Sequence, residues 1–193
     1  MKRALIAGLA ATLFAGVAGA QDIRPQERAR LDRFERLAGT ALMEGMAGGS
    51  ASDVAQLVTA LSGTPQVAFD PSLAGDWRCR TIKLGGLTRL VVYTNFKCRM
   101  TLDNTGVTFE KLTGSQRTSG RIEMREGRAI YLGVGYVSTE APQEYGQLAP
   151  DFEGTATVYP DVAVFERISA TRARLIFPAP VNESDLDILE LTR

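Results

Sequence analysis

The sequence predicts a mainly β protein, an antiparallel barrel of about eight strands over residues 70–193, preceded by a helical hairpin. Two observations support this prediction. Apolar residues recur every three or four positions over residues 24–61, and from about residue 70 they alternate with a period of two. Turn sequences such as Gly85-Gly86 and Asn104-Thr105-Gly106 separate the alternating runs at short intervals, which favours an antiparallel barrel or sandwich.

The first twenty residues have the composition of a secretory signal peptide. Lys2 and Arg3 precede an uncharged apolar stretch that ends at Val17, and Ala18-Gly19-Ala20 supplies the small residues that a signal peptidase recognises. We therefore expect cleavage near Ala20 and a soluble product that is periplasmic or secreted. The apolar stretch is shorter than the about 20 residues of a membrane-spanning helix, and no later segment approaches that length.

Residues 21–69 are predicted to form the helical hairpin segment. Gly48-Gly49-Ser50 breaks the helical pattern, and the spacing of Ser50 and Asp53 resembles a capping box at the start of a second helix. Gly63 and Pro65 end that helix. The apolar stripes of both helices are expected to pack against the barrel, although a partner-binding face is an alternative.

Residues 70–193 contain the predicted strands. The candidates are 75–84, 89–102, 106–113, 116–126, 129–138, 155–167, 173–178 and 186–193. A long break at 139–153 contains two prolines and a glycine, and loops of that length commonly cover or gate a site.

The two cysteines, Cys79 and Cys98, are expected to form a structural disulfide. Export favours oxidation, and the two residues fall on neighbouring predicted strands of an antiparallel hairpin. A bridged cysteine is neither a nucleophile nor a metal ligand, so this pair is interpreted as a structural crosslink.

Composition excludes several functional classes. The chain has no histidine, which removes Ser-His and Cys-His catalysis and imidazole metal ligands. Loss of residues 1–20 leaves 20 basic and 22 acidic residues, a balance that predicts no nucleic-acid partner.

Glu183, Asp185 and Asp187 alternate as calcium ligands can, but a solvated turn is favoured because no glycine-turned loop accompanies them. We assign no catalytic residue, metal or cofactor, and expect no enzymatic activity.

A candidate ligand site lies at the Gly114-Ser115 turn. A two-residue turn there pairs Thr113 with Gln116 and Lys111 with Thr118, on the face that also carries Phe109 and Ile122. Polar residues on an inner face at one end of a barrel are typical of a ligand-binding mouth, or of an end that is simply open to water. The candidate ligand-binding residues are Lys111, Thr113, Gln116 and Thr118, and Tyr131, Tyr136 and Tyr145 are candidates for lining the same mouth.

Gly75-Asp76-Trp77 at the first strand resembles the Gly-x-Trp signature of lipocalins and related calycin barrels. The resemblance implies a calycin-like barrel in which Trp77 plugs the closed end beneath an arginine near the last strand, either Arg174 or Arg193.

Longer runs resemble a family of exported bacterial proteins that is known only as a domain of unknown function. They include residues 73–83, Phe96-Lys97-Cys98-Arg99, residues 110–121, Phe165-Glu166-Arg167-Ile168 and residues 187–191. That family implies no activity, cofactor or catalytic residue.

Three functions remain, in this order. The first is a non-catalytic barrel that binds a small or amphipathic molecule, and the second is an envelope interaction protein, inhibitor or assembly factor with a solid barrel. The third is a carboxylate-based hydrolase, which requires two inward carboxylates about 5–9.5 Å apart. An interior cavity above roughly 300 Å³ favours the first function, and a filled interior favours the second.

Overall fold

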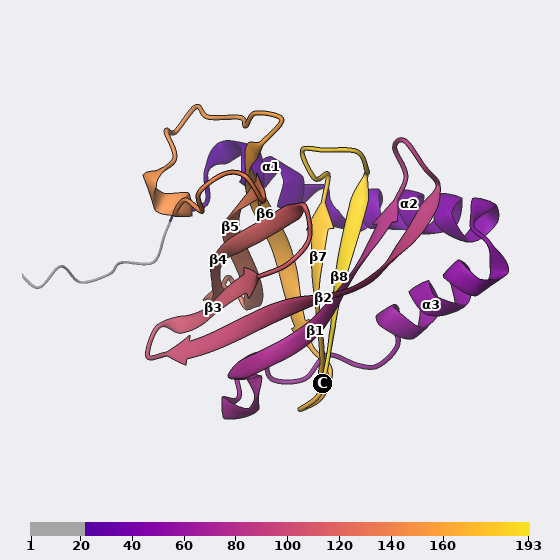
Figure 1. The fold of residues 1–193 in the computed structure, drawn as a ribbon, viewed down its shortest axis with the longest axis horizontal. Helices are drawn as coiled ribbons and strands as arrows, with labels where there is room; N and C mark the ends of the chain where they lie inside the picture. The colour runs from indigo at the N-terminus through magenta and orange to yellow at the C-terminus, as the bar shows by residue number, and fades with distance from the viewer. Residues whose placement is uncertain (1–21) are drawn as a thin grey trace, which may run out of the picture.

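The computed structural model describes residues 22–193, and the predicted signal peptide lies outside this part of the chain. Eight antiparallel strands form a closed barrel in which each strand pairs with the next and β8 pairs with β1 (Figure 1). The strands are β1 (Gly75–Leu84), β2 (Leu90–Asp103), β3 (Gly106–Lys111), β4 (Gln116–Arg125), β5 (Arg128–Val137), β6 (Val158–Arg167), β7 (Arg172–Pro178) and β8 (Leu186–Thr192). The predicted barrel is confirmed, and each strand ends within three residues of its predicted limits.

Three helices precede the barrel: α1 (Pro25–Asp32), α2 (Phe34–Gly48) and α3 (Ala51–Leu61). The Ser50 hydroxyl caps α3 by accepting the Asp53 amide at 3.1 Å, as the capping-box spacing predicts. The predicted first helix is divided at Arg33, whose φ of −98° and ψ of 4° end α1, and the buried residues of α1 are the polar Glu27 and Arg30. Among residues 22–193, no helix has the length and apolar character needed to cross a membrane.

Hydrogen bonds fasten α1 to two parts of the barrel. The buried Glu27 carboxylate accepts from the Tyr145 hydroxyl at 2.8 Å and from the Arg24 guanidinium at 2.7 Å. These bonds hold the long connection between β5 and β6 against α1. Arg30 donates to the carbonyls of Pro160 in β6 and Pro178 in β7, both at 3.0 Å, beyond the point where the β6–β7 ladder ends.

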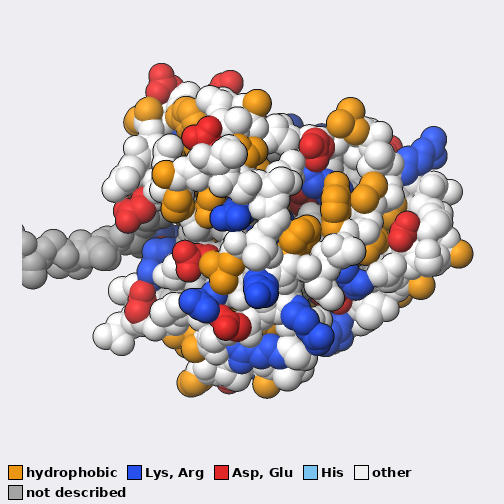
Figure 2. All heavy atoms as spheres, viewed as in Figure 1, with side chains coloured by type: hydrophobic (Ala, Val, Ile, Leu, Met, Phe, Trp, Pro, Cys, Tyr) orange, Lys and Arg blue, Asp and Glu red, His pale blue; other side chains and the backbone are white. Residues whose placement is uncertain are grey.

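The barrel wall is apolar on both of its faces over much of its circumference. Inside, the Tyr131 ring packs edge to face against Phe109 and against Phe177, with ring centroids 5.9 Å apart in both pairs. Outside, the helices cover a second apolar layer that includes Leu57 of α3 and Ile82 of β1. Figure 1 shows α2 and α3 running along the outside of the barrel beside β1 and β2. Figure 2, which is viewed from the same side, shows basic, acidic and apolar side chains mixed on the surface turned to the viewer.

Trp77 closes one end of the barrel. Its indole is buried and donates to the Leu73 carbonyl at 2.8 Å. Arg193, not Arg174, is the arginine that covers it, since Arg174 pairs with Glu166 on the outer wall. The predicted disulfide is formed between Cys79 and Cys98, whose Cα atoms lie 5.9 Å apart inside the barrel.

Candidate functional site

The end of the barrel opposite Trp77 carries polar side chains on its inner wall. Four connections meet at this end, over residues 85–89, 112–115, 138–157 and 179–185. We call the space that they surround the mouth pocket. Its polar lining includes Lys83, Lys111, Gln116, Thr118, Tyr159, Asp161 and Asp187.

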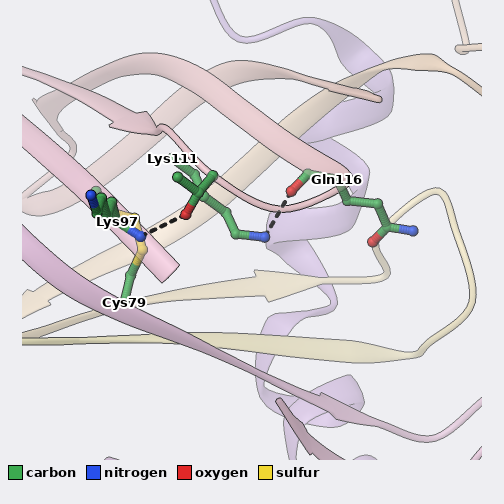
Figure 3. Close-up of a disulfide and its surroundings, with 6 residues drawn as sticks. Cys79, Lys97, Lys111 and Gln116 are labelled. Atoms are coloured by element: carbon green, nitrogen blue, oxygen red, sulfur yellow. Dashed lines mark hydrogen bonds between the residues drawn. A yellow bond between two sulfur atoms is a disulfide. The ribbon is translucent and has the colours of Figure 1, made fainter. Parts of the chain in front are cut away.

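Three of the four residues predicted for a ligand site line the mouth pocket: Lys111, Gln116 and Thr118. Thr113 does not, because its hydroxyl accepts the backbone amide of Lys97 at 2.9 Å (Figure 3). The β3–β4 ladder keeps the predicted register but ends at Glu110–Ser119. The tight turn expected at Gly114-Ser115 is therefore a longer loop, and Thr113 leaves the inner face.

Among the candidate tyrosines, Tyr131 points into the barrel, whereas Tyr136 and Tyr145 belong to the apolar layer outside it. None of the three lines the mouth pocket, so these candidates are buried residues of the barrel interior and of its outer apolar layer. Residues 130–136 are buried on both faces of β5, so their alternation could not distinguish inside from outside.

A chain of hydrogen bonds runs from Tyr131 to Asp161. The Thr118 hydroxyl donates to Asp161 Oδ2 at 2.7 Å and lies 2.7 Å from the Tyr131 hydroxyl. Because the single hydroxyl proton of Thr118 goes to Asp161, the Tyr131 hydroxyl donates to Thr118. Burial raises the pKa of Tyr131. Burial also raises the pKa of Asp161, while the hydrogen bond from Thr118 and the positive charge of Arg30 oppose that shift.

Two glycines on the inner face of β5 make room for this arrangement. A Cβ atom at Gly133 would lie 2.1 Å from the Tyr131 hydroxyl oxygen. A Cβ atom at Gly135 would lie 2.1 Å from the ring of Tyr159. The positions of both tyrosines therefore depend on bare backbone at these residues.

Lys83 is paired with carboxylates at the rim. Its ammonium donates to Glu183 at 2.7 Å and to the Gln116 side chain at 3.1 Å, and it lies 3.9 Å from Asp187. Burial lowers the pKa of Lys83, but the charges of Asp187 and Glu183 outweigh burial and raise it. Burial raises the pKa of Asp187 to about 6, against the attraction of Lys83.

Lys111 is buried without such a partner. Its ammonium donates to the Gln116 carbonyl at 2.7 Å (Figure 3). It also lies 4.1 Å from the centroid of the Phe96 ring. No ion pair within 4.0 Å joins it to any carboxylate of residues 22–193. Burial lowers the pKa of Lys111 to about 8, and repulsion by Lys83 adds to the effect.

The mouth pocket holds a cavity of about 60 Å³. A second space of about 170 Å³, which we call the rim recess, shares Thr81, Lys83, Lys111 and Gln116 with it and adds Tyr93 and Phe96. Below the pocket, the apolar half of the interior is packed with the side chains that surround Tyr131.

The sequence interpretation missed Lys83, Tyr159 and Asp161. Lys83 lies on the same face of its strand as Trp77 and Cys79, a signal that could have placed it inside. Tyr159 and Asp161 gave no such signal, since β6 is buried on both faces.

The three acidic residues weighed as calcium ligands bind different donors. Glu183 binds Lys83, Asp185 accepts the Gly86 amide at 3.1 Å, and Asp187 accepts the Ser184 hydroxyl at 2.5 Å. Within the part of the chain that the structure describes, no group of three or more His, Cys, Asp or Glu is arranged to hold a metal ion.

Residues 20–191 match the model of a family described as "Domain of unknown function (DUF4893)". The chain belongs to this family. The match covers both the helices and the barrel of this DUF4893 protein. Comparison with curated proteins and with solved structures finds no match.

Proposed function

We propose that this DUF4893 protein is an exported, non-catalytic binding module that holds a small polar molecule in the mouth pocket. The observation that carries the proposal is the concentration of charged and hydrogen-bonding side chains on the inner wall at the open end of an otherwise apolar barrel. Ligand pockets combine such convergent polar groups with apolar walls. A solid structural barrel has no need to bury Lys111 and Asp161, because each buried charge costs stability.

The size of the cavity restricts the ligand. At about 60 Å³ the cavity is far below the roughly 300 Å³ of a typical small-molecule pocket. Phe109, Tyr131 and Phe177 occupy the space where a long apolar chain would lie. We therefore favour a small polar molecule, or the polar end of a larger one, over an amphipathic ligand.

The filled interior also favours the second candidate, an envelope interaction protein or assembly factor with a solid barrel. Leu87 is 82 % exposed and Val181 is 42 % exposed, on two turns of the mouth that contact each other through the Leu87 amide and the Glu183 carbonyl. Exposed apolar side chains on adjoining turns are suited to a protein partner. This candidate predicts that Leu87→Ser with Val181→Ser removes the interaction, whereas Lys111→Met leaves it intact.

A carboxylate-based hydrolase ranks below both candidates. Asp161 and Asp187 line the same pocket, as that function requires. Thr118 and Ser184 already donate to these carboxylates, and a cavity of about 60 Å³ does not accommodate a sugar ring between them.

The binding proposal is tested by nuclear magnetic resonance of the labelled, exported protein with a set of small polar metabolites. We expect at least one compound to shift the resonances of Thr118, Asp161 and Asp187 in a saturable manner. Thr118→Val should weaken that binding at least tenfold, and Thr101→Val, which changes an exposed threonine of β2, should not. If no polar compound perturbs the mouth pocket, the proposal is wrong.

A further inference from the structure

We propose that Lys111 is the receptor for a carboxylate, so that the ligand of the mouth pocket is a small organic monoanion. This inference rests on the proposed binding function and specifies the chemistry of its ligand. It is carried by the surroundings of Lys111, which, unlike Lys83 in the same pocket, is buried without an ion pair within 4.0 Å among residues 22–193.

The buried ammonium of Lys111 has no counter-ion close to it among the residues that the structure describes. Lys111 is only 8 % exposed, and it forms no ion pair within 4.0 Å among residues 22–193. A buried ammonium without a carboxylate is costly, because the protein must remove its water without replacing the charge interaction. Lys83 on the neighbouring wall is paired with Glu183, so the pocket treats its two lysines differently.

The Lys111 ammonium also has hydrogen-bonding capacity that the protein leaves unused. An ammonium group has three donors. One of them is used by the Gln116 carbonyl at 2.7 Å, and the Phe96 ring offers its face at 4.1 Å without accepting a conventional hydrogen bond. The remaining capacity of Lys111 suits the oxygens of a bound anion.

The space around Lys111 and the charges that line it restrict the size and the charge of the ligand. Lys111 lines both the cavity of about 60 Å³ and the rim recess of about 170 Å³, which together suit a compact group. Asp161 and Asp187 attract Lys111 from beyond ion-pair distance, so a single bound negative charge would supply the close partner that it lacks. Asp161 and Asp187 on the opposite wall disfavour a more highly charged group such as phosphate, so a carboxylate is the better match.

The experiment compares acetate with acetamide, which has nearly the same shape and no charge. Both are titrated into the labelled, exported protein while the resonances of Gln116, Thr118 and the Lys111 side chain are followed. We expect saturable shifts with acetate, with a dissociation constant on the order of millimolar for so small a ligand, and at least tenfold weaker binding of acetamide. Binding of acetate should also weaken above about pH 8, as Lys111 loses its proton.

Two variants separate Lys111 from general charge effects. Lys111→Met should weaken acetate binding at least tenfold. Lys97→Met removes an exposed lysine from the adjacent strand and should leave binding unchanged. In case Lys111→Met does not fold, the wild-type protein supplies a second measurement, because bound acetate should raise the pKa of the Lys111 amine.

The outcomes distinguish the two proposals. If neutral compounds such as acetamide or glycerol bind at the mouth pocket and acetate does not, the carboxylate inference is overturned and the binding function stands. Binding of inorganic phosphate without acetate, or undiminished acetate binding by Lys111→Met, overturns the inference as well. If neither charged nor neutral probes perturb the mouth pocket, both proposals are wrong.

Discussion

The guanidinium of Arg193 lies 4.1 Å from the centroid of the Trp77 ring and donates to the backbone carbonyls of Ser72, Leu73 and Ala74. The residue after the last strand thereby fastens the segment that enters the first strand, at the closed end of the barrel. Arg193→Met should lower the free energy of unfolding by on the order of 1–3 kcal/mol, because the hydrogen bonds and the cation–π contact are lost.

Tryptophan fluorescence during chemical denaturation measures this effect, since Trp77 is the one tryptophan of the chain. Arg99→Met is the matched control, because Arg99 forms an exposed ion pair with Asp76 and should contribute little. Equal stability of the two variants would contradict the role given to Arg193.

The disulfide should stabilise the barrel by restricting the unfolded chain. Cys79 and Cys98 are separated by 19 positions, and closing a loop of that size contributes about 3 kcal/mol. Replacing both cysteines with alanine should lower the denaturation midpoint accordingly. Thiol titration of the exported, denatured wild-type protein should find no free cysteine, and detection of two would refute the crosslink.

Gly133→Ala should disrupt the mouth pocket. Its Cβ atom would meet the Tyr131 hydroxyl oxygen at 2.1 Å and the Ser119 carbonyl oxygen at 2.6 Å, so the phenol must leave Thr118. We expect a destabilisation of roughly 1–3 kcal/mol, as for other overpacked interiors. Gly39→Ala in α2 is the control, since no atom lies within 4 Å of its added Cβ and alanine favours a helix. Thermal unfolding should move the two variants in opposite directions.

Asp187→Asn should change the pH dependence of stability. Burial raises the folded pKa of Asp187 to about 6, so its stabilising contribution is complete below the unfolded value near 4 and is lost as the pH rises through 6. Asparagine remains neutral throughout. The variant should therefore gain stability relative to the wild type between pH 4 and pH 7, by on the order of 2 kcal/mol. Denaturation at several pH values measures this difference, and a difference that is constant with pH would contradict the prediction.

Lys111→Met should stabilise the protein at neutral pH. The folded pKa of Lys111 is about 8, below its ordinary value of 10.5, so the cost of burying the charged amine is complete below pH 8 and disappears as the pH rises toward 10.5. Methionine avoids this cost. The variant should exceed the wild type by roughly 1–3 kcal/mol at pH 7 and converge with it near pH 10. A variant less stable than the wild type at pH 7 would show that Lys111 is compensated within the protein.

The sequence by itself determined the strands and the disulfide, and the resemblance of Gly75-Asp76-Trp77 to calycin barrels implied the plug. Alternation is legible in β3, β4 and the first half of β1 because these segments face the interior on one side and are largely open on the other. That same alternation placed Lys111 and Thr118 on the inner wall, because residues two positions apart on a strand share a face.

Only the tertiary structure decided which strands pair to close the barrel and which side chains meet at its mouth. Pairing of β8 with β1 joins segments about a hundred residues apart, and local periodicity carries no information about such pairing. Strands β5 and β6 are covered by helices outside and by side chains inside, so their nearly continuous burial conceals which face holds Asp161. Asp161, Lys83 and Asp187 lie on three different strands, and they meet because the sheet closes on itself.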